Sequence, residues 1–96
     1  MAYFTARVVL HSWADSSHYA VLHTAMTNAG FSRVVAANDG ANYELPPAEY
    51  LLIGTYKIAD VLAKAQSAAA QTGHTDSILV TEGVTLTWSG LKRVPQ

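Results

Sequence analysis

The chain has 96 residues, no cysteine, a formal net charge of −1, and 50% apolar residues against 14% charged ones. This length accommodates one domain, residues 1–96, and the absence of cysteine excludes disulfides, thiolate nucleophiles and cysteine-ligated zinc. The near-neutral charge excludes the broad basic surface of proteins that hold long nucleic acids, and it leaves contact with a short single-stranded RNA open.

The first thirty residues predict a strand followed by a helix. Residues 3–11 alternate in polarity, and one side of the strand carries Phe4, Ala6, Val8 and Leu10. The next segment supplies candidate helix N-caps, namely Ser12, Asp15, Ser16 and Ser17. Residues 16–29 then show helical spacing, with Leu22, Met26 and Ala29 in the buried stripe. Gly30 follows where a helix often ends with a positive φ.

The middle of the chain predicts a long-looped antiparallel hairpin. Residues 31–37 form a second strand centred on Val34 and Val35, and residues 50–53 form a third. The connection 38–48 contains an Asp-Gly pair and two prolines, which are turn residues.

A second helix and a fourth strand follow. The helix begins after Gly54 and Thr55, and its expected buried stripe consists of Ile58, Val61, Leu62, Ala65, Ala68 and Ala69. Residues 78–81 predict the fourth strand. Residues 84–88 also alternate cleanly, so they either prolong that strand or form an edge strand that pairs with another subunit.

The element order β-α-β-β-α-β predicts an α+β fold, a single ferredoxin-like sandwich. Two β-α-β units with right-handed crossovers give a four-stranded antiparallel sheet with both helices on one face. The other face is then uncovered and carries, on the first strand, Tyr3, Thr5, Arg7, Val9 and His11. An uncovered face that is partly apolar indicates a binding platform or a subunit interface.

Three polar residues are expected together at one edge of this sheet. His11 ends the first strand, Asp15 lies in the following loop, and His18 lies in the first helix. Because imidazoles titrate near neutral pH, this set suits a general acid–base pair that moves the proton of an RNA 2′-hydroxyl. The alternative is structural, with Asp15 capping the helix and both histidines half-exposed.

His23, Arg7, Arg33 and Tyr3 complete the candidate site. His23 lies beside the buried stripe of the first helix, where its ring is either a functional group or an ordinary surface residue. Arg7 must lie on the open face because burying its charge is costly, and there it either holds a phosphate or pairs with an acid across a dimer interface. Arg33 opens the second strand, and Tyr3 is a candidate for stacking on a base.

The sequence predicts neither a metal site nor a cofactor site. His18 and His23 are five residues apart, which differs from the i, i+4 pair of a zinc-binding helix. The chain also has no Gly-rich phosphate loop of the kind that cradles nucleotides.

Most of the chain, roughly residues 4–82, resembles the GhoS family of type V antitoxins. The matching features are the strand run 6–11, the helix start at Ser16 and Ser17, and a set of later positions: Leu22, Met26, Phe31, Ser32, Val34, Val35, Gly40, Leu45, Pro46 and Tyr50. The resemblance implies a ferredoxin-like endoribonuclease that cleaves a toxin messenger RNA. At the helix positions where that family carries basic residues this chain has Val21 and His23, and only His23 could take that role.

Two functions therefore remain open. One is an RNA-binding antitoxin, with or without metal-independent endoribonuclease activity, acting through His23, Arg7 and the edge formed by His11, Asp15 and His18. The other is a non-catalytic homodimeric regulatory module, which the low charge favours. No apolar run approaches a membrane span and no signal peptide is recognised, so the expected location is the cytoplasm.

Overall fold

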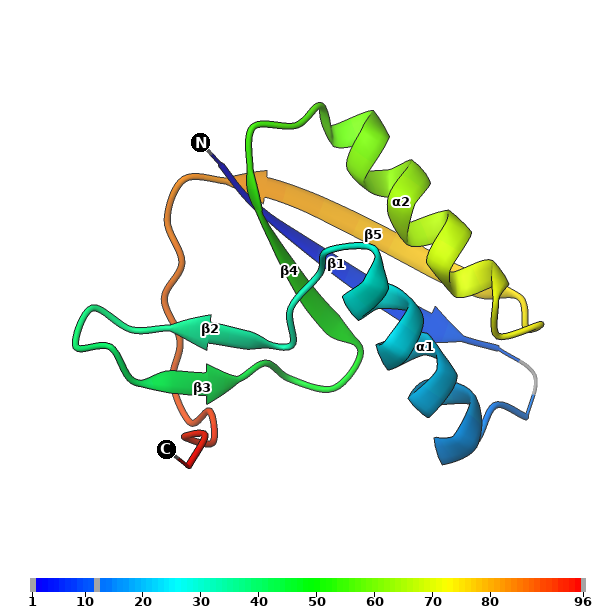
Figure 1. The fold of residues 1–96 in the computed structure, drawn as a ribbon, viewed down its shortest axis with the longest axis horizontal. Coiled ribbons are helices and arrows are strands. Elements are labelled where there is room, and N and C mark those ends of the chain that lie inside the picture. The colour runs from blue at the N-terminus through cyan, green and yellow to red at the C-terminus, as the bar shows by residue number, and fades with distance from the viewer. Residues whose placement is uncertain (1, 12, 96) are drawn as a thin grey trace.

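The computed structural model describes residues 2–11 and 13–95, so the N-cap candidate Ser12 lies outside the described residues. The element order is βαβββαβ (Figure 1). The elements are β1 (Ala2–Leu10), α1 (Ser16–Asn28), β2 (Val34–Ala36), β3 (Asn42–Glu44), β4 (Glu49–Gly54), α2 (Ile58–Ala70) and β5 (Asp76–Gly83). The α+β class, both helices and the strands β1, β2, β4 and β5 were expected from the sequence.

The main sheet has three antiparallel strands in the order β4-β1-β5. In its register, Ala6 of β1 lies between Tyr50 of β4 and Val80 of β5. The amide of Val8 donates to Ala48 on the β4 side, and the amide of His11 donates to Thr75 on the β5 side. Because hydrogen-bonded pairs alternate along antiparallel strands, even residues of β1 bond to β4 and odd residues bond to β5.

The four-stranded sheet expected from the sequence is not formed. Ser32 makes one antiparallel bridge to Leu51 of β4, and the chain then turns away so that β2 pairs with β3 in a separate two-stranded sheet. The strand β3 arises inside the segment that was expected to be a turn. Its other edge is held by the C-terminal segment, through a bridge between Tyr43 and Arg93. The sequence pattern did not indicate β3 because the turn residues of 38–48 conceal it: β3 pairs with β2 across a short turn and with the distant C-terminal segment on its other edge.

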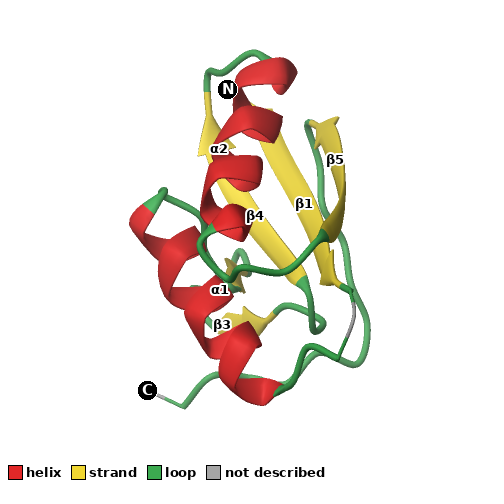
Figure 2. Cartoon of the chain, turned by 90° about the vertical axis from the view of Figure 1, so that its right-hand side faces the viewer, coloured by secondary structure: helices red, strands yellow, loops and turns green. Residues whose placement is uncertain are grey.

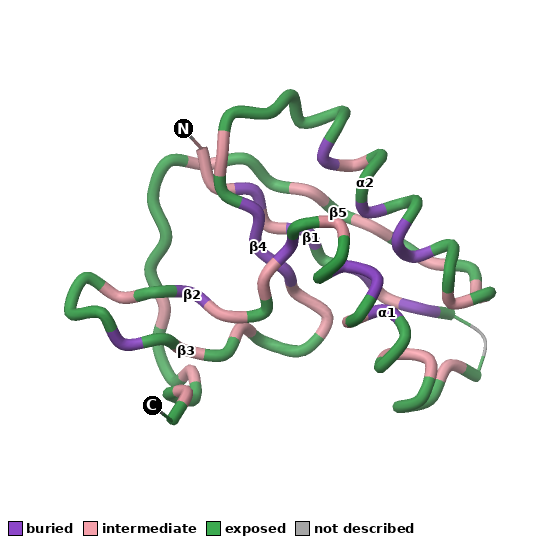
Figure 3. Tube along the Cα trace, viewed as in Figure 1, coloured by how far each residue is buried: buried purple, intermediate pink, exposed green. Residues whose placement is uncertain are grey.

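Both helices cover the same face of the main sheet (Figure 2). The core lies between them and the sheet, and its fully buried side chains include Phe4, Val8, Leu22, Met26, Tyr50 and Val61. Figure 3 shows these buried positions along the facing sides of β1, β4, α1 and α2. Gly30 has a positive φ of 101° just after α1, as expected. Within the described residues, no helix is long and apolar enough to cross a membrane.

Residues 84–88 form no strand, although their alternation predicts one. The chain leaves β5 and runs to the β2–β3 hairpin, where the amide of Glu44 donates to Lys92 and the amide of Val94 donates to Asn42 (Figure 1). Trp88 packs its ring against Tyr43, with 5.7 Å between the centroids. Trp13 is 96% exposed, so it is not part of the core edge.

The alanine-rich side of α2 gives a test of core packing. Ala65 is fully buried, whereas Ala63 of the same helix is exposed. We expect Ala65→Leu to destabilise the protein by about 1–3 kcal/mol, because added methylenes must displace neighbouring side chains. Ala63→Leu should change stability little, which chemical denaturation will measure. Equal effects of the two variants would contradict this placement of the helix.

Candidate functional site

One cavity of about 270 Å³ brings two of the predicted residues together. It is lined by Tyr19, His23, Arg33, Pro47 and Ala48. Tyr19 and His23 lie one turn apart on α1, so their side chains lie on the same side of the helix. Arg33 lies directly before β2, and the two remaining residues belong to the loop between β3 and β4. Four segments therefore meet around His23 and Arg33: α1, the residue before β2, the loop between β3 and β4, and the strand β4.

The ring of His23 is held by Tyr50 of β4. Its Nδ1 lies 2.6 Å from the Tyr50 hydroxyl. Burial raises the pKa of Tyr50 to about 12, so the hydroxyl keeps its proton at neutral pH. We assign Tyr50 as the donor and Nδ1 as the acceptor. A neutral imidazole then carries its proton on Nε2, which makes no hydrogen bond to the described residues.

Burial lowers the pKa of His23 from its ordinary value of 6.5, and the nearby Arg33 guanidinium lowers it further. His23 is therefore neutral at pH 7. The cavity offers two kinds of donor, the N–H at Nε2 and the guanidinium of Arg33. Donors of this kind suit an oxyanion such as a phosphate, which Arg binds with two parallel hydrogen bonds.

Asp15 and His18 form a helix cap. The Asp15 carboxylate accepts hydrogen bonds from the amides of Ser17 and His18, at 2.9 and 3.3 Å, and its amide donates to Nδ1 of His18 at 3.1 Å. This is a capping box in which histidine takes the place of the usual glutamate. The same Nδ1 is 3.1 Å from the carboxylate. Nδ1 of a neutral His18 can accept from the Asp15 amide, whereas Nδ1 of a protonated His18 donates to the Asp15 carboxylate instead.

His11 joins the same region through His74, a residue that is not among the predicted site residues. Nδ1 of His74 donates to the carbonyl of His11 at 3.0 Å, and the ring of His74 packs edge-on against His18 with 4.1 Å between centroids. Nε2 of His11 lies 2.8 Å from the hydroxyl of Ser77. The predicted edge cluster therefore forms, and its bonds connect the end of β1, the start of α1 and the start of β5.

The contacts of this edge cluster suit a structural role, joining β1, α1 and β5, better than they suit catalysis. Ser77 and His11 are close enough for a nucleophile and its base, but both are exposed and no described residue orients the other nitrogen of His11. The carboxylate of Asp15 is occupied by the helix amides. Within residues 2–11 and 13–95, no group of three or more His, Asp or Glu side chains is arranged to hold a metal ion.

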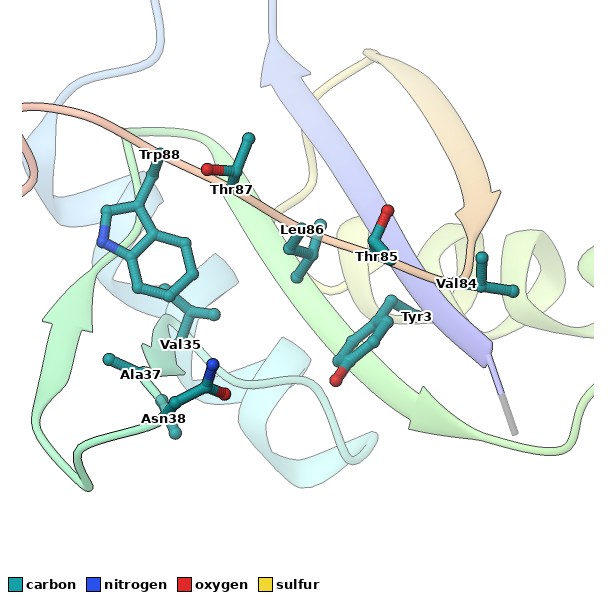
Figure 4. Close-up of a pocket in the computed structure, with 10 residues that line it drawn as sticks. Tyr3, Val35, Ala37, Asn38, Val84, Thr85, Leu86, Thr87 and Trp88 are labelled. Atoms are coloured by element: carbon teal, nitrogen blue, oxygen red, sulfur yellow. The ribbon is translucent and has the colours of Figure 1, made fainter.

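Arg7 and Tyr3 lie apart from the His23 cavity. Arg7 is exposed on the open face of the sheet, in a shallow hollow with Val9 and Leu79. Tyr3 borders a groove of about 460 Å³ between β2 and the segment 84–88 (Figure 4). The labelled side chains in that view come from β1, from the end of β2 and from this segment. The seven predicted site residues thus occupy four places on the molecule.

Sequence reasoning missed Tyr50 as a functional partner, because it stands in the apolar run of a buried strand. Its side chain is fully buried, so its ring is not available to stack on a base. A usable signal exists: a tyrosine in a fully buried strand needs a partner for its hydroxyl. His23 on the flank of the neighbouring helix was an available partner.

Neither the protein-family models nor the curated proteins contain a match to this chain.

The capping role of Asp15 predicts a pH-dependent stability. Hydrogen bonds from the Ser17 side chain, then from the amides of His18 and Ser17, lower the pKa of Asp15 below 3.8. Its contribution is complete above pH 3.8 and is lost as the pH falls through the lower, folded-state pKa. Asp15→Ala should lower the thermal midpoint at pH 7, and Asp15→Asn should retain most of it because asparagine also caps helices. Equal losses in both variants would contradict the cap.

The neighbourhood of His23 predicts a measurable titration. Arg33→Gln should raise the pKa of His23 without restoring 6.5, because burial, the larger cause, remains. NMR titration of the ring protons measures this change. Lys57→Gln, which removes an exposed charge at the start of α2, serves as the control and should leave the pKa of His23 unchanged. A pKa that does not respond to Arg33→Gln would place the guanidinium away from the ring.

Proposed function

We propose that the protein is an RNA-binding antitoxin resembling GhoS, and that it binds a phosphate of single-stranded RNA in the His23 cavity. The observation that carries this proposal is the neutral imidazole held by Tyr50 beside the guanidinium of Arg33. Two of the residues singled out in the sequence, His23 and Arg33, line this one cavity. A messenger RNA target would place the protein in the cytoplasm.

The binding mode follows from the donors. Arg33 donates hydrogen bonds to two phosphate oxygens. The N–H at Nε2 of His23 donates a third hydrogen bond to an oxygen of the same phosphate. Pro47 and Ala48 give the cavity an apolar side against which the sugar or base packs. A bound phosphate favours the protonated imidazole, so binding takes up a proton and strengthens as the pH falls toward the pKa of His23. With few cations available, the salt dependence should be shallow.

The same groups support metal-independent cleavage of RNA. The Tyr50 hydroxyl accepts as well as donates, so the second tautomer of His23, with its proton on Nδ1, is also stabilised. Nε2 then takes the proton of the 2′-hydroxyl as the 2′-oxygen bonds to phosphorus and the bond to the 5′-oxygen breaks. Arg33 stabilises the charge on the phosphorane. The products are a 2′,3′-cyclic phosphate and a 5′-hydroxyl, whose proton comes from water.

For the fold, we propose a ferredoxin-like sandwich whose outer strand has shrunk to a single bridge. Ser32 pairs with Leu51 at the outer edge of β4, which is the position of the second strand in that arrangement. The order from that bridge is β4, β1, β5, with both helices on one face. The β2–β3 hairpin is then an insertion that begins where the outer strand would have continued.

A non-catalytic homodimeric module is the second candidate. The observation that favours it is a set of exposed apolar side chains on or next to the open side of the sheet: Ile53, Leu79 and Val84 are 49%, 65% and 77% exposed. Apolar groups gathered in this way are typical of an interface.

RNA binding tests the first candidate. We expect the protein to bind a labelled single-stranded RNA at low salt in fluorescence anisotropy, more tightly at pH 6 than at pH 8. Arg33→Gln should weaken binding about tenfold, since it removes a charged hydrogen-bond donor. Lys57→Gln removes the same charge elsewhere and should have a small effect. Absence of binding at low salt, or equal losses in Arg33→Gln and Lys57→Gln, would contradict RNA binding at this cavity.

Cleavage is tested with a mixed RNA pool, with and without EDTA. Cutting that persists in EDTA, leaves cyclic phosphate ends and disappears in His23→Ala supports the enzyme. Binding without cutting retains the RNA-binding function and removes the catalytic one. His74→Ala is the matched control, because His74 belongs to the edge cluster and not to the cavity.

A further inference from the structure

The outer edge of β5 is a free strand edge. Within the described residues, β5 pairs only with β1. The bond from the His11 amide to Thr75 shows that odd residues of β5 face β1, so the backbone groups of Asp76, Ile78, Val80 and Glu82 point outward. Proteins usually protect such edges with lysine, proline or a bulge. The segment 76–88 contains no lysine, arginine or proline.

The sequence of this edge is a chemical palindrome. Residues 76–82 read Asp-Ser-Ile-Leu-Val-Thr-Glu, which is acid, hydroxyl, β-branched, leucine, β-branched, hydroxyl, acid. Read backwards, as an antiparallel partner presents it, the order of residue types is the same. The centre, Leu79, is 65% exposed on the open face. A strand edge that matches its own reverse is suited to a second copy of the same chain, because a two-fold axis makes identical patches meet.

We propose that the protein forms a homodimer in which β5 pairs antiparallel with β5 of a second copy, with the two-fold axis at Leu79. Leu79 then faces the partner's Leu79 in a non-hydrogen-bonded pair, where side chains lie closest. Ile78 faces the partner's Val80 and exchanges two backbone hydrogen bonds with it. The two three-stranded sheets become one continuous six-stranded sheet, and the free edge disappears.

This register has a built-in weakness at each end. Asp76 faces the partner's Glu82, and like charges directly opposite each other destabilise a strand pair. Moving the axis to Ile78 places Asp76 opposite Val80, and moving it to Val80 places Glu82 opposite Ile78, so either shift sets an acid against an apolar residue. The leucine-centred register is therefore the best apolar match, and its strength should depend on the charge of the two acids.

Sedimentation equilibrium of the full chain tests the proposal. The wild-type protein should reach twice the 10.3 kDa of one chain at about 0.5 mM. Leu79→Lys should weaken association at least tenfold, since it places two ammonium groups opposite each other. Glu82→Gln should tighten it about tenfold, because it removes both acid pairs. Ile53→Lys is the matched control: an exposed apolar side chain of β4, away from the edge, whose replacement should have no effect.

Amide hydrogen exchange gives a readout that needs no substitution. The amides of Ile78 and Val80 point outward, so they should exchange rapidly when dilute and become protected as the concentration rises. The amides of Ser77 and Leu79 bond to β1 and should be protected throughout. A monomer at all concentrations overturns the dimer. A dimer that Ile53→Lys disrupts and Leu79→Lys spares, or that Glu82→Gln weakens, overturns this interface.

The proposed dimer interface and the proposed RNA site can be contradicted independently of each other. The dimer involves none of the residues that line the His23 cavity. Loss of RNA binding in a dimeric protein would therefore remove only the proposed function, and a monomer that binds RNA would remove only the dimer.

Discussion

The fold depends on the central strand β1, which uses both of its backbone edges. Its even residues bond to β4 and place Phe4, Ala6 and Val8, all fully buried, against the helices. Its odd residues bond to β5 and face the open side. A one-residue shift in register would exchange the two faces completely, so the buried side chains and both ladders specify one arrangement.

Two histidine contacts tie the helix α1 to this sheet, in addition to the hydrogen bond that the Leu10 amide donates to the Tyr19 hydroxyl. At its N-terminus, the capping box and the His18–His74 contact join it to the end of β1 and the start of β5. In its middle, His23 accepts from Tyr50, which lies at the far edge of the core. The first contact orders a helix start, which is a common structural need. The second leaves an imidazole N–H directed away from its partner beside a cation, and this is why the His23 cavity carries the functional proposal.

The elements predicted correctly from the sequence are those that depend on patterns among neighbouring residues. The alternation of β1 and the stripes of both helices depend on local spacing, and Leu22, Met26, Val61 and Ala65 are buried as expected. The strand β3 was not predicted because turn residues surround it, although it pairs with β2 across a short turn. The segment 84–88 was not predicted correctly because its backbone joins no strand of the described residues. His23 and Arg33 were recognised singly as chemical types, whereas the loop between β3 and β4 completes their cavity and β4 supplies Tyr50.

The low net charge of the chain gives a reason to consider the His23 cavity and the outer edge of β5 together. A single chain with net charge −1 offers one strong cation at the cavity, and one phosphate contact yields weak binding. A dimer paired through β5 would carry two such cavities at a fixed separation. Binding of one RNA strand to both makes the second contact intramolecular, which raises affinity without adding charge to either chain. In the proposed dimer, the acids at the ends of the β5 pair would affect the proposed RNA binding as well, because a weaker dimer would separate its two cavities.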